Sequence, residues 1–451
     1  MAWQSTLKVS VSGVRGIVGD SLTMQLGASF ATAFGTYVGK GKVIIGRDTR
    51  PTGLMLQNAI VSGLLSVGCE PVLCDVLPTP SILMLVDELK AKGGICITAS
   101  HNPNEWNAMK FVGPDGLFLN STEAVELLDL YNQEAYEYVP ENEIRKVSTL
   151  ENPFDCHKQR VFKHIDLEKI RAANFTVAVD CCNGAGALFS KDFLEELGCK
   201  VIAINDTDDG IFTRGPEPIP ENLIDLCTAV REHNCIVGFA QDPDCDRLAM
   251  VDGNGDTIGE NTTLTLAVDH ILSHKKGYVV TNLSSSKAIE DITKRHGCEL
   301  FYSKIGEINV TEKMLKCDAV IGGEGNGGVI WPAVHPCRDS YTAMALTLEM
   351  LAERQQSLVE IMKNTPRYDT ANFKMTCTLE RAQRIIRTLR EQFVEQRQSN
   401  LDGLRIDWDD RWVLVRPSNT EPIIRVGAEA PSQDEADELA REFLQKCKGI
   451  L

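Results

Sequence analysis

Four short loops in this sequence carry residue types that can do chemistry, and each follows an apolar run typical of a buried strand. The first is TASHNP (98–103), in which Ser100 could carry a phosphoryl group if cations and a metal offset the added charge. His101 is the second reactive side chain of this loop. The same residues are also typical of a helix N-cap, which needs no ligand.

The second loop, DPDCDR (242–247), alternates carboxylates with other residues. Asp242, Asp244 and Asp246 can converge on one hard cation, and oxygen ligands suit Mg²⁺ or Ca²⁺. An EF-hand is excluded, because the sixth and twelfth positions lack the Gly and Glu that it requires. Two other interpretations stay open: an aspartyl-phosphate enzyme with Asp242 as nucleophile, and a solvated turn without a cation.

The third and fourth loops have the composition of ligand-binding turns. In GGEGNGG (322–328) the glycines let the backbone approach a ligand, while Glu324 and Asn326 can bind hydroxyl groups. In RPSNTEP (416–422) an arginine, hydroxyls and an amide can cradle a phosphate. Either loop could instead be a polar turn with no ligand.

Apolar β-branched runs alternate with helical patterns over most of the chain, which is typical of parallel α/β units. From about residue 367 the strands are grouped, which indicates a smaller α+β domain. We therefore predict domains at 1–152, 153–254, 255–366 and 367–451. The strands expected in the α/β part are 42–48, 71–75, 93–100, 175–180, 200–205, 235–240, 277–282, 299–304 and 318–325, with helices at 53–67, 185–197 and 222–233. The C-terminal part is expected to hold strands at 373–379, 404–408, 412–418 and 422–430, and helices at 381–396 and 432–446.

The composition excludes several classes of protein. With 46 basic and 63 acidic side chains the net charge is −17, so neither nucleic acid nor a membrane surface is an expected partner. The fifteen cysteines are scattered, some of them inside apolar runs, which is typical of buried reduced thiols in a reducing cytosol. The sequence MAWQSTLKVS lacks the apolar core of a signal peptide, and no run approaches the ~20 apolar residues of a membrane helix. We expect a cytoplasmic protein.

Together the four loops, in this order and at these intervals, resemble the α-D-phosphohexomutase superfamily. The segments GVRG (13–16) and KIG (304–306) match it as well, so the resemblance covers nearly the whole chain. It implies an α/β protein with three tandem related α/β domains with mixed sheets, plus a smaller C-terminal α+β domain, around a central cleft. This agrees with the four domains predicted above from the residues alone.

The resemblance implies an intramolecular phosphotransferase. Ser100 would give its phosphoryl group to a hexose phosphate, and the resulting 1,6-bisphosphate would return its other phosphate, so that 6-phosphate and 1-phosphate interconvert. One Mg²⁺ per chain would be held by Asp242, Asp244, Asp246 and a phosphoserine oxygen, and hexose 1,6-bisphosphate would be the activator. The expected partner is a small hexose phosphate, and the chain would be a monomer or a homodimer.

The resemblance also implies roles for residues outside the serine and aspartate motifs. Lys110 is the candidate general acid or base, with His101 the weaker one, and as a base Lys110 would need a depressed pKa. The residues expected beside the phosphoryl group are Arg15 and Arg247, those expected on the sugar are Glu324, Asn326 and Lys304, and those expected on the non-reacting phosphate are Arg416, Ser418, Asn419, Thr420 and Arg425.

The sugar is indicated by two features that point in different directions. GEGNGG resembles a subgroup of phosphoglucosamine mutases, whereas Asn419 is typical of phosphomannomutase/phosphoglucomutases. We favour glucosamine phosphate and keep mannose or glucose phosphate as the alternative. A phosphoserine-dependent sugar phosphatase is a remoter alternative, and a non-catalytic sugar-phosphate sensor is disfavoured because it needs no phosphoryl carrier.

Overall fold

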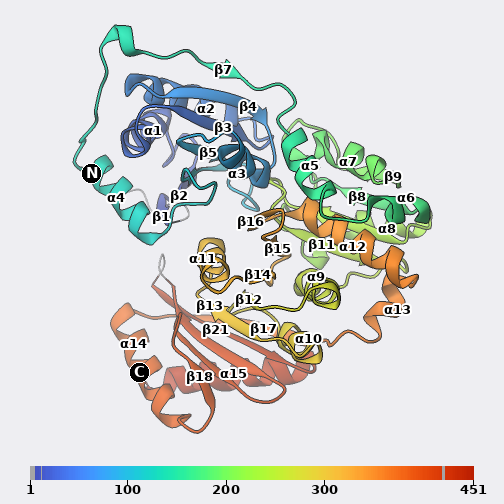
Figure 1. Cartoon of the computed structure of the whole chain (residues 1–451). Coiled ribbons are helices and arrows are strands. Elements are labelled where there is room, and N and C mark those ends of the chain that lie inside the picture. The colour runs from blue at the N-terminus through green and yellow to red at the C-terminus, as the bar shows by residue number, and fades with distance from the viewer. Residues whose placement is uncertain (1–5, 12, 419–421, 451) are drawn as a thin grey trace. The chain divides into compact units, whose positions relative to one another are not determined.

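The computed structural model describes residues 6–11, 13–418 and 422–450 (Figure 1). It divides into two compact units. Unit 1 contains Met1–Thr263 together with Gly327–Val359, and unit 2 contains Leu264–Asn326 together with Glu360–Leu451. The chain therefore leaves unit 1 once, returns to it, and ends in unit 2.

The N-terminal part of unit 1 is a mixed sheet flanked by helices (Figure 1). Its strands are β1 (Lys8–Ser10), β2 (Gly13–Ile17), β3 (Lys42–Arg47), β4 (Glu70–Val76), β5 (Gly93–Ile97), β6 (Trp106–Val112) and β7 (Ser148–Thr149), and its helices include α1 (Met24–Val38), α2 (Gly53–Ser66), α3 (Thr79–Glu88) and α4 (Ser121–Asn132). The strand order is β1-β2-β6-β5-β3-β4-β7, in which β5, β3 and β4 are parallel and β6 runs antiparallel to β5. All of β5 and most of β3 are buried, as expected of parallel strands covered on both faces.

Local sequence explains where these helices begin. Thr23 caps α1 by accepting a hydrogen bond from the backbone N–H of Leu26, and Asn120 forms a capping box with Glu123 at the start of α4. The apolar face of α1 packs into the core of this domain, where the ring of Phe34 lies 5.0 Å from that of Phe111. The sheet edge that carries the serine loop thus rests on an apolar core.

A second mixed sheet follows in unit 1. Its strands are β8 (Thr176–Asp180), β9 (Lys200–Ile204), β10 (Val237–Gln241) and β11 (Leu248–Asp252), and its helices include α5 (Asp155–Phe162), α7 (Ser190–Glu196) and α8 (Ile224–Glu232). The strand order is β11-β10-β8-β9, with β8, β9 and β10 parallel and β11 antiparallel. The helix expected over 185–197 is divided into a 3₁₀ turn, η2 (Ala185–Leu188), and α7.

The segment that returns to unit 1 is a hairpin and a buried helix. The hairpin is formed by β15 (Gly328–Trp331) and β16 (His335–Arg338), which pair antiparallel. Helix α12 (Ser340–Arg354) follows at once, and Asp339 caps it by accepting a hydrogen bond from the N–H of Tyr341 at 2.9 Å.

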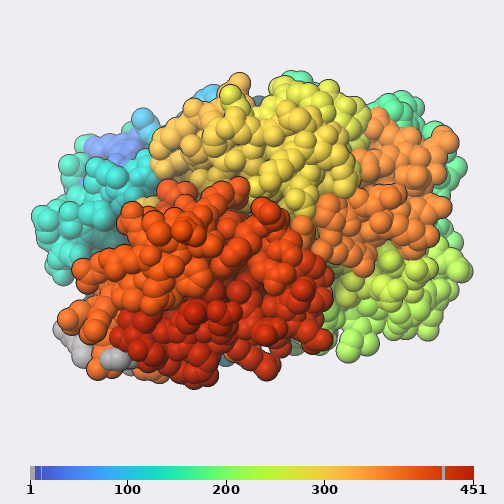
Figure 2. Space-filling model, turned by 90° about the horizontal axis from the view of Figure 1, so that it is seen from below, coloured from blue at the N-terminus to red at the C-terminus, as the bar shows by residue number. Residues whose placement is uncertain are grey.

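Unit 2 joins a parallel α/β segment to an antiparallel sheet. The first part holds β12 (Val279–Asn282), β13 (Leu300–Ser303), β14 (Ile321–Glu324), α10 (Lys287–Arg295) and α11 (Glu307–Cys317), with β12 parallel to both β13 and β14. The second part holds β17 (Asp369–Thr376), β18 (Arg397–Ser399), β19 (Leu404–Asp407), β20 (Trp412–Pro417), β21 (Ile423–Ala430), α14 (Leu379–Gln392) and α15 (Gln433–Ile450). Its strand order is β17-β21-β20-β19-β18, and the space-filling view shows this part as one continuous body coloured orange to red (Figure 2).

The predicted fold class is confirmed: α/β segments with mixed sheets precede an antiparallel α+β domain. Some boundaries were wrong. The strand expected over 93–100 ends at Ile97, and Leu379 begins α14 instead of ending a strand, because Thr378 caps that helix. Helix α14 also ends at Gln392, four residues before the expected end. All fifteen cysteines lie in the described part of the chain and all are free thiols. Among the described helices, none is both long and apolar enough to cross a membrane.

Candidate active site

Ser100 lies in a tight turn three residues beyond the end of β5. Its side chain is buried, and its Oγ donates a hydrogen bond to Oδ2 of Asp242 at 2.8 Å. Its backbone φ is +49°, in the left-handed region that residues other than glycine seldom adopt. This turn aims the hydroxyl at the aspartate loop that follows β10, so the structure brings the first two predicted motifs together.

A buried ion pair fixes the serine loop from behind. Arg50 donates from Nε to Asp48 Oδ2 at 2.9 Å, and both side chains are almost wholly buried. The two other nitrogens of the guanidinium donate to four carbonyl groups in and just after the serine loop, at 2.6–3.1 Å. These carbonyls belong to Ser100, Asn102, Pro103 and Trp106. All five N–H groups of Arg50 are therefore used, which makes this residue the main anchor of the loop.

The three predicted aspartates are buried and their carboxylate oxygens lie within 4.8 Å of one another. In each carboxylate, one oxygen is held by the protein. Oδ1 of Asp242 accepts from the N–H groups of Asp246 and Arg247, both at 3.1 Å. Oδ2 of Asp244 accepts from Lys110 at 2.6 Å and from Thr79 at 2.9 Å, and Oδ2 of Asp246 accepts from Arg338.

The remaining carboxylate oxygens fit a cation. Oδ1 of Asp244 and Oδ1 of Asp246 are buried and have no hydrogen-bond partner in the described part of the chain. Oδ2 of Asp242 accepts from the hydroxyl of Ser100, whose proton is lost when the serine is phosphorylated. A buried carboxylate oxygen without a partner is costly, and one oxygen of each aspartate lies within 4.8 Å of the other two, as carboxylate ligands of one Mg²⁺ would.

The pKa values of these aspartates reflect their mutual repulsion. Burial, together with the charges of Asp246 and Asp244, raises the pKa of Asp242 well above its ordinary value. Burial acts in the same sense on Asp244, but the Lys110 ammonium outweighs it and lowers the pKa of that carboxyl. A bound cation would relieve this repulsion.

Arg15 and Arg247 lie beside the serine and aspartate loops, in addition to Arg50, Lys110 and Arg338. Arg15 donates to Oδ1 of Asn102 at 2.8 Å, so it lies against the serine loop. Arg247 lies 3.5 Å from Glu217 and 3.7 Å from Oδ1 of Asp246, and its Nε is buried without a hydrogen bond in the described residues. The structure thus gathers basic side chains around these two loops, although the chain as a whole is acidic. An anionic ligand needs such a local cluster in a chain with a net charge of −17.

Lys110 and His101, the candidates for proton transfer, have opposite protonation tendencies. Burial disfavours the ammonium of Lys110, but Asp244 and Asp246 outweigh it and raise its pKa. This is opposite to the depressed pKa that a lysine base requires, so the ammonium form of Lys110 is favoured, with Asp244 at 2.6 Å. Burial and the nearby Arg247 lower the pKa of His101 to about 3, so its imidazole is neutral at pH 7, with Nδ1 3.3 Å from Ser100 Oγ.

The predicted sugar loop lies at the end of β14 in unit 2. Glu324 is buried, and its Oε1 accepts from Asn282 Nδ2 at 2.7 Å and from the N–H of Gly306 at 2.8 Å. Oδ1 of Asn326 is buried and lacks a partner among the described residues, whereas Lys304 is exposed.

Two glycines of this loop serve packing. A Cβ on Gly322 would lie 2.3 Å from the carbonyl oxygen of Val280, and a Cβ on Gly327 would lie 2.3 Å from that of Leu248. These two positions therefore need glycine for the contact with a neighbouring strand, independently of any ligand.

The predicted phosphate loop follows β20. Arg416 and Ser418 are half-buried and Arg425 is exposed on β21, while Asn419 and Thr420 lie outside the described residues. Asp402, which the sequence did not single out, links this loop to the KIG segment (304–306) within unit 2. Its Oδ1 lies 3.3 Å from Arg416 Nε, and its Oδ2 accepts from the N–H of Ile305 at 3.3 Å.

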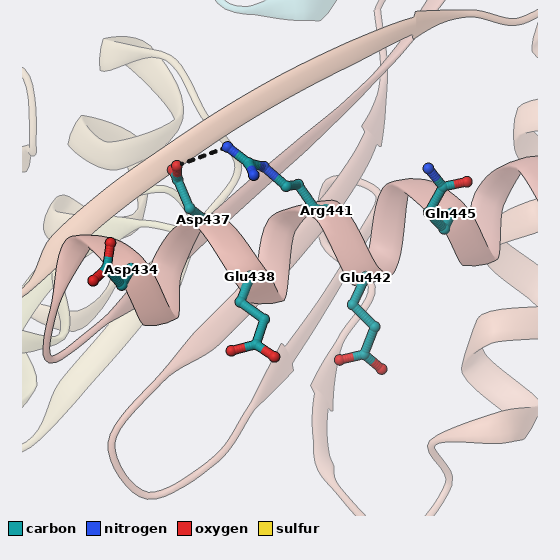
Figure 3. A pocket seen from close by; sticks show the side chains of 6 residues that line it. All are labelled: Asp434, Asp437, Glu438, Arg441, Glu442 and Gln445. Carbon is teal, nitrogen blue, oxygen red and sulfur yellow. Dashed lines mark hydrogen bonds and ion pairs between the residues drawn. The ribbon is translucent and has the colours of Figure 1, made fainter.

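A shallow acidic hollow on the outer face of α15 carries no comparable chemistry (Figure 3). Its side chains project outward from one helix, and the ion pair between Asp437 and Arg441 spans 3.2 Å between two exposed groups. A solvated helix face accounts for it.

Arg50, Arg338 and Asp402 are the site residues that sequence analysis missed. Arg50 stands in the loop GRDTRPTG, where the pattern of two arginines around an aspartate after a strand was a usable signal. Arg338 reaches Asp246 across 92 residues, so no local pattern could reveal it.

A buried serine hydroxyl, three buried carboxylates and nearby arginines are the residue types of a phosphoryl-transfer site. Comparison with known proteins identifies which class. The four phosphoglucomutase/phosphomannomutase family models match in order: α/β/α domain I over 6–137, domain II over 156–255, domain III over 259–368 and the C-terminal domain over 375–446. The chain belongs to this family of phosphohexomutases.

Individual relatives cover almost the whole chain. A Thermococcus kodakarensis protein named phosphoglucomutase/phosphomannomutase is 36% identical over 446 residues, which are 96% of either chain. A Pyrococcus horikoshii protein named probable phosphoglucosamine mutase is 34% identical and covers 98% of this chain and 97% of its own. A solved family protein from Burkholderia thailandensis, at 24% identity, has the same fold, with a TM-score of 0.86 and 98% of each chain covered.

Proposed function

We propose that this phosphohexomutase interconverts glucosamine 6-phosphate and glucosamine 1-phosphate through a phosphoserine at Ser100. The observation that carries the proposal is the hydrogen bond of Ser100 to Asp242, beside two buried carboxylate oxygens without partners in the described chain. Phosphorylated Ser100 would donate its phosphoryl group to one sugar hydroxyl. The bond from phosphorus to Oγ breaks, and a bond from phosphorus to the sugar oxygen forms.

One Mg²⁺ per chain is the proposed metal. Asp242, Asp244, Asp246 and a phosphoserine oxygen would hold it, and when bound it would neutralise charge on the transferring group. The partnerless oxygens of Asp244 and Asp246 support this choice, since oxygen-only ligands suit a hard cation.

The chain's own cations would orient the phosphoryl group. Arg15, placed by its bond to Asn102, and Arg247, placed beside Asp246, carry planar groups that can donate two hydrogen bonds to a phosphate. For the proton of the sugar hydroxyl we keep two candidates. Lys110 is held as an ammonium on Asp244 and could protonate an oxygen, and the neutral His101 could accept a proton.

The loops of unit 2 would supply the binding contacts. We propose that Glu324, Asn326 and Lys304 bind sugar hydroxyls, and the buried carboxylate of Glu324 supports this role. The non-reacting phosphate would be bound by the fourth loop, at Arg416, Ser418, Asn419, Thr420 and Arg425. Hexose 1,6-bisphosphate would act as activator by donating a phosphoryl group to unphosphorylated Ser100.

The choice of sugar has two supports that disagree. The relative from Pyrococcus horikoshii is named for glucosamine phosphate, as the GEGNGG loop predicts, while that from Thermococcus kodakarensis is named for glucose and mannose phosphates. We therefore keep phosphomannomutase/phosphoglucomutase activity as the second candidate. We also propose a cytoplasmic monomer or homodimer, divided at 152, 254 and 366, and the four matched family ranges support that division.

Phosphorus NMR tests the proposal directly. The enzyme is incubated with Mg²⁺, a trace of hexose 1,6-bisphosphate, and either glucosamine 6-phosphate or mannose 1-phosphate. We expect the other isomer to appear without free phosphate, and faster with the glucosamine compound. Faster turnover of the mannose compound would transfer the assignment to the second candidate, and free phosphate without an isomer would mean a phosphatase.

Ser100→Ala is the matching control variant. It should abolish isomer exchange while a hexose phosphate still binds, because the phosphoryl carrier is lost and the binding loops remain. Exchange at the wild-type rate in this variant would refute the phosphoserine mechanism.

A further inference from the structure

Three buried side chains from distant parts of unit 1 form a continuous hydrogen-bonded relay. Nδ1 of His157 lies 2.8 Å from Oγ of Ser81, and Nε2 of His157 lies 2.9 Å from Oδ2 of Asp339. Ser81 is in the first turn of α3, His157 is in α5, and Asp339 caps α12. We call these three residues the buried relay.

The buried relay has the residue types of a hydrolase triad, but it cannot act as one. The exposed fractions of Ser81, His157 and Asp339 are 0%, 0% and 2%, so no substrate can reach the serine. The imidazole is also enclosed by aromatic rings, with those of Phe154 and Tyr341 both 5.2 Å away. Because the carboxylate of Asp339 only accepts, Nε2 donates to it, and Nδ1 shares the second hydrogen bond with the hydroxyl of Ser81.

Each end of the relay stands next to a residue that holds the aspartate loop. Two residues before Ser81, Thr79 donates from its N–H to the carbonyl of Asp244 and from Oγ1 to Oδ2 of the same residue, both at 2.9 Å. At the other end, Arg338 directly precedes Asp339 and donates to Oδ2 of Asp246.

We propose that His157 is a positioning residue for the cation site. By joining α3 to the start of α12, it keeps Thr79 on Oδ2 of Asp244 and Arg338 on Oδ2 of Asp246. The Oδ1 atoms of both carboxylates are then left for the cation. The proposal rests on the cation site proposed above and adds the residue that fixes its geometry.

The three segments lie in different family ranges, which explains why a link is needed. Ser81 falls in the range of domain I, His157 in that of domain II and Asp339 in that of domain III. The three aspartates belong to domain II alone. The contacts of Thr79 and Arg338 with them therefore depend on the positions of domains I and III relative to domain II. Contacts behind the ligands of a metal typically change its affinity by about 10 to 100-fold when they are removed.

Magnesium binding to the full chain tests the proposal. The probe is Mg²⁺ alone, measured by titration calorimetry, for the wild type, Asp244→Asn, His157→Gln and Ser81→Ala. Glutamine can keep the bond to Asp339 and loses the one to Ser81, while Ser81→Ala breaks the same link with almost no change in packing. Ile60→Val, a buried change in α2 remote from the aspartates, serves as the control for general loss of stability.

We expect His157→Gln to raise the dissociation constant for Mg²⁺ about 10-fold. Ser81→Ala should raise this dissociation constant less. Ile60→Val should leave it within about 2-fold of the wild-type value, even if its melting temperature falls as much as that of the relay variants. In the mutase assay, saturating Mg²⁺ should restore the kcat of both relay variants, with the KM for hexose phosphate unchanged.

Wild-type affinity for Mg²⁺ in both relay variants would overturn the proposal, as would a loss of kcat that excess Mg²⁺ does not restore. A wild type that binds no Mg²⁺, or an Asp244→Asn variant that binds it normally, would instead refute the cation site and the positioning role with it.

Discussion

Replacing Arg50 by lysine should loosen the serine loop while keeping its positive charge. The guanidinium uses five N–H donors, on Asp48 and on four carbonyls of the loop. Lysine has three donors, so at least two buried acceptors lose their partner. At ~1–3 kcal/mol for each unsatisfied buried group, the free energy of unfolding should fall by about 4 kcal/mol.

Activity should fall as well, because this loop sets the left-handed turn at Ser100. A displacement of the hydroxyl by about 1 Å would reduce kcat roughly 100-fold. Urea denaturation measures the first effect and the mutase assay the second. Arg441→Lys is the matched control: its pair with Asp437 is exposed, so the change should stay below about 0.5 kcal/mol.

The reasoning would be refuted by an Arg50→Lys protein within about 1 kcal/mol of the wild type in unfolding free energy and within about 2-fold in kcat. That result would mean that the loop keeps its conformation without the anchor. Loss of stability with an unchanged kcat would mean that Arg50 stabilises the fold but does not affect catalysis.

Three further outcomes follow from the structure. Asp244→Asn should abolish both Mg²⁺ binding and isomer exchange, as chelation of the metal should do reversibly in the wild type; calorimetry and NMR measure the two effects. Glu290 should stabilise unit 2 at neutral pH, because Arg397 and Lys294 overcome its burial and lower its pKa to about 2. The shift corresponds to about 3 kcal/mol, which solvent screening at the exposed Arg397 and Lys294 reduces to ~2 kcal/mol. This contribution is present above the unfolded pKa near 4.5 and lost as pH falls towards 2, so acid unfolding of Arg397→Met should begin from a lower stability and show less of this slope. Burial raises the pKa of Cys69 to about 11 and of Cys74 to about 12, so a thiol reagent at pH 8 should modify these two only after denaturation, as mass spectrometry of labelled peptides would record.

The sequence was informative where function is encoded over a few residues. Ser100 and the three aspartates could be predicted because each motif directly follows an apolar strand, where ligand-binding loops of α/β sheets lie. Their meeting could not be predicted this way, because β5 and β10 belong to two different sheets. The strands β3 and β5 were predicted to within a few residues, because a buried parallel strand is a short continuous apolar run. The central cleft implied by the resemblance stays a prediction.

The contacts that hold the motifs were beyond the sequence. His157 looks like any histidine in a polar segment, and only the packing of α5 against α3 and α12 gives it two partners. The raised pKa of Lys110, opposite to what a lysine base needs, could not be read from the sequence for the same reason. Its shift depends on Asp244, 134 residues away in the chain, at 2.6 Å in the fold.

The order in which unit 1 is assembled along the chain has a consequence for its synthesis. The aspartate loop is complete by Arg247, but Arg338 and Asp339 are translated only after the excursion through Leu264–Asn326. At ~5–20 residues per second, the ribosome delivers them about 5–20 s later. During that interval the carboxylates of the loop have emerged without Arg338, the cationic partner of Asp246. A nascent chain stalled before β16 should therefore be protease-sensitive around residue 244. A message truncated at that point should yield a fragment that does not bind the metal.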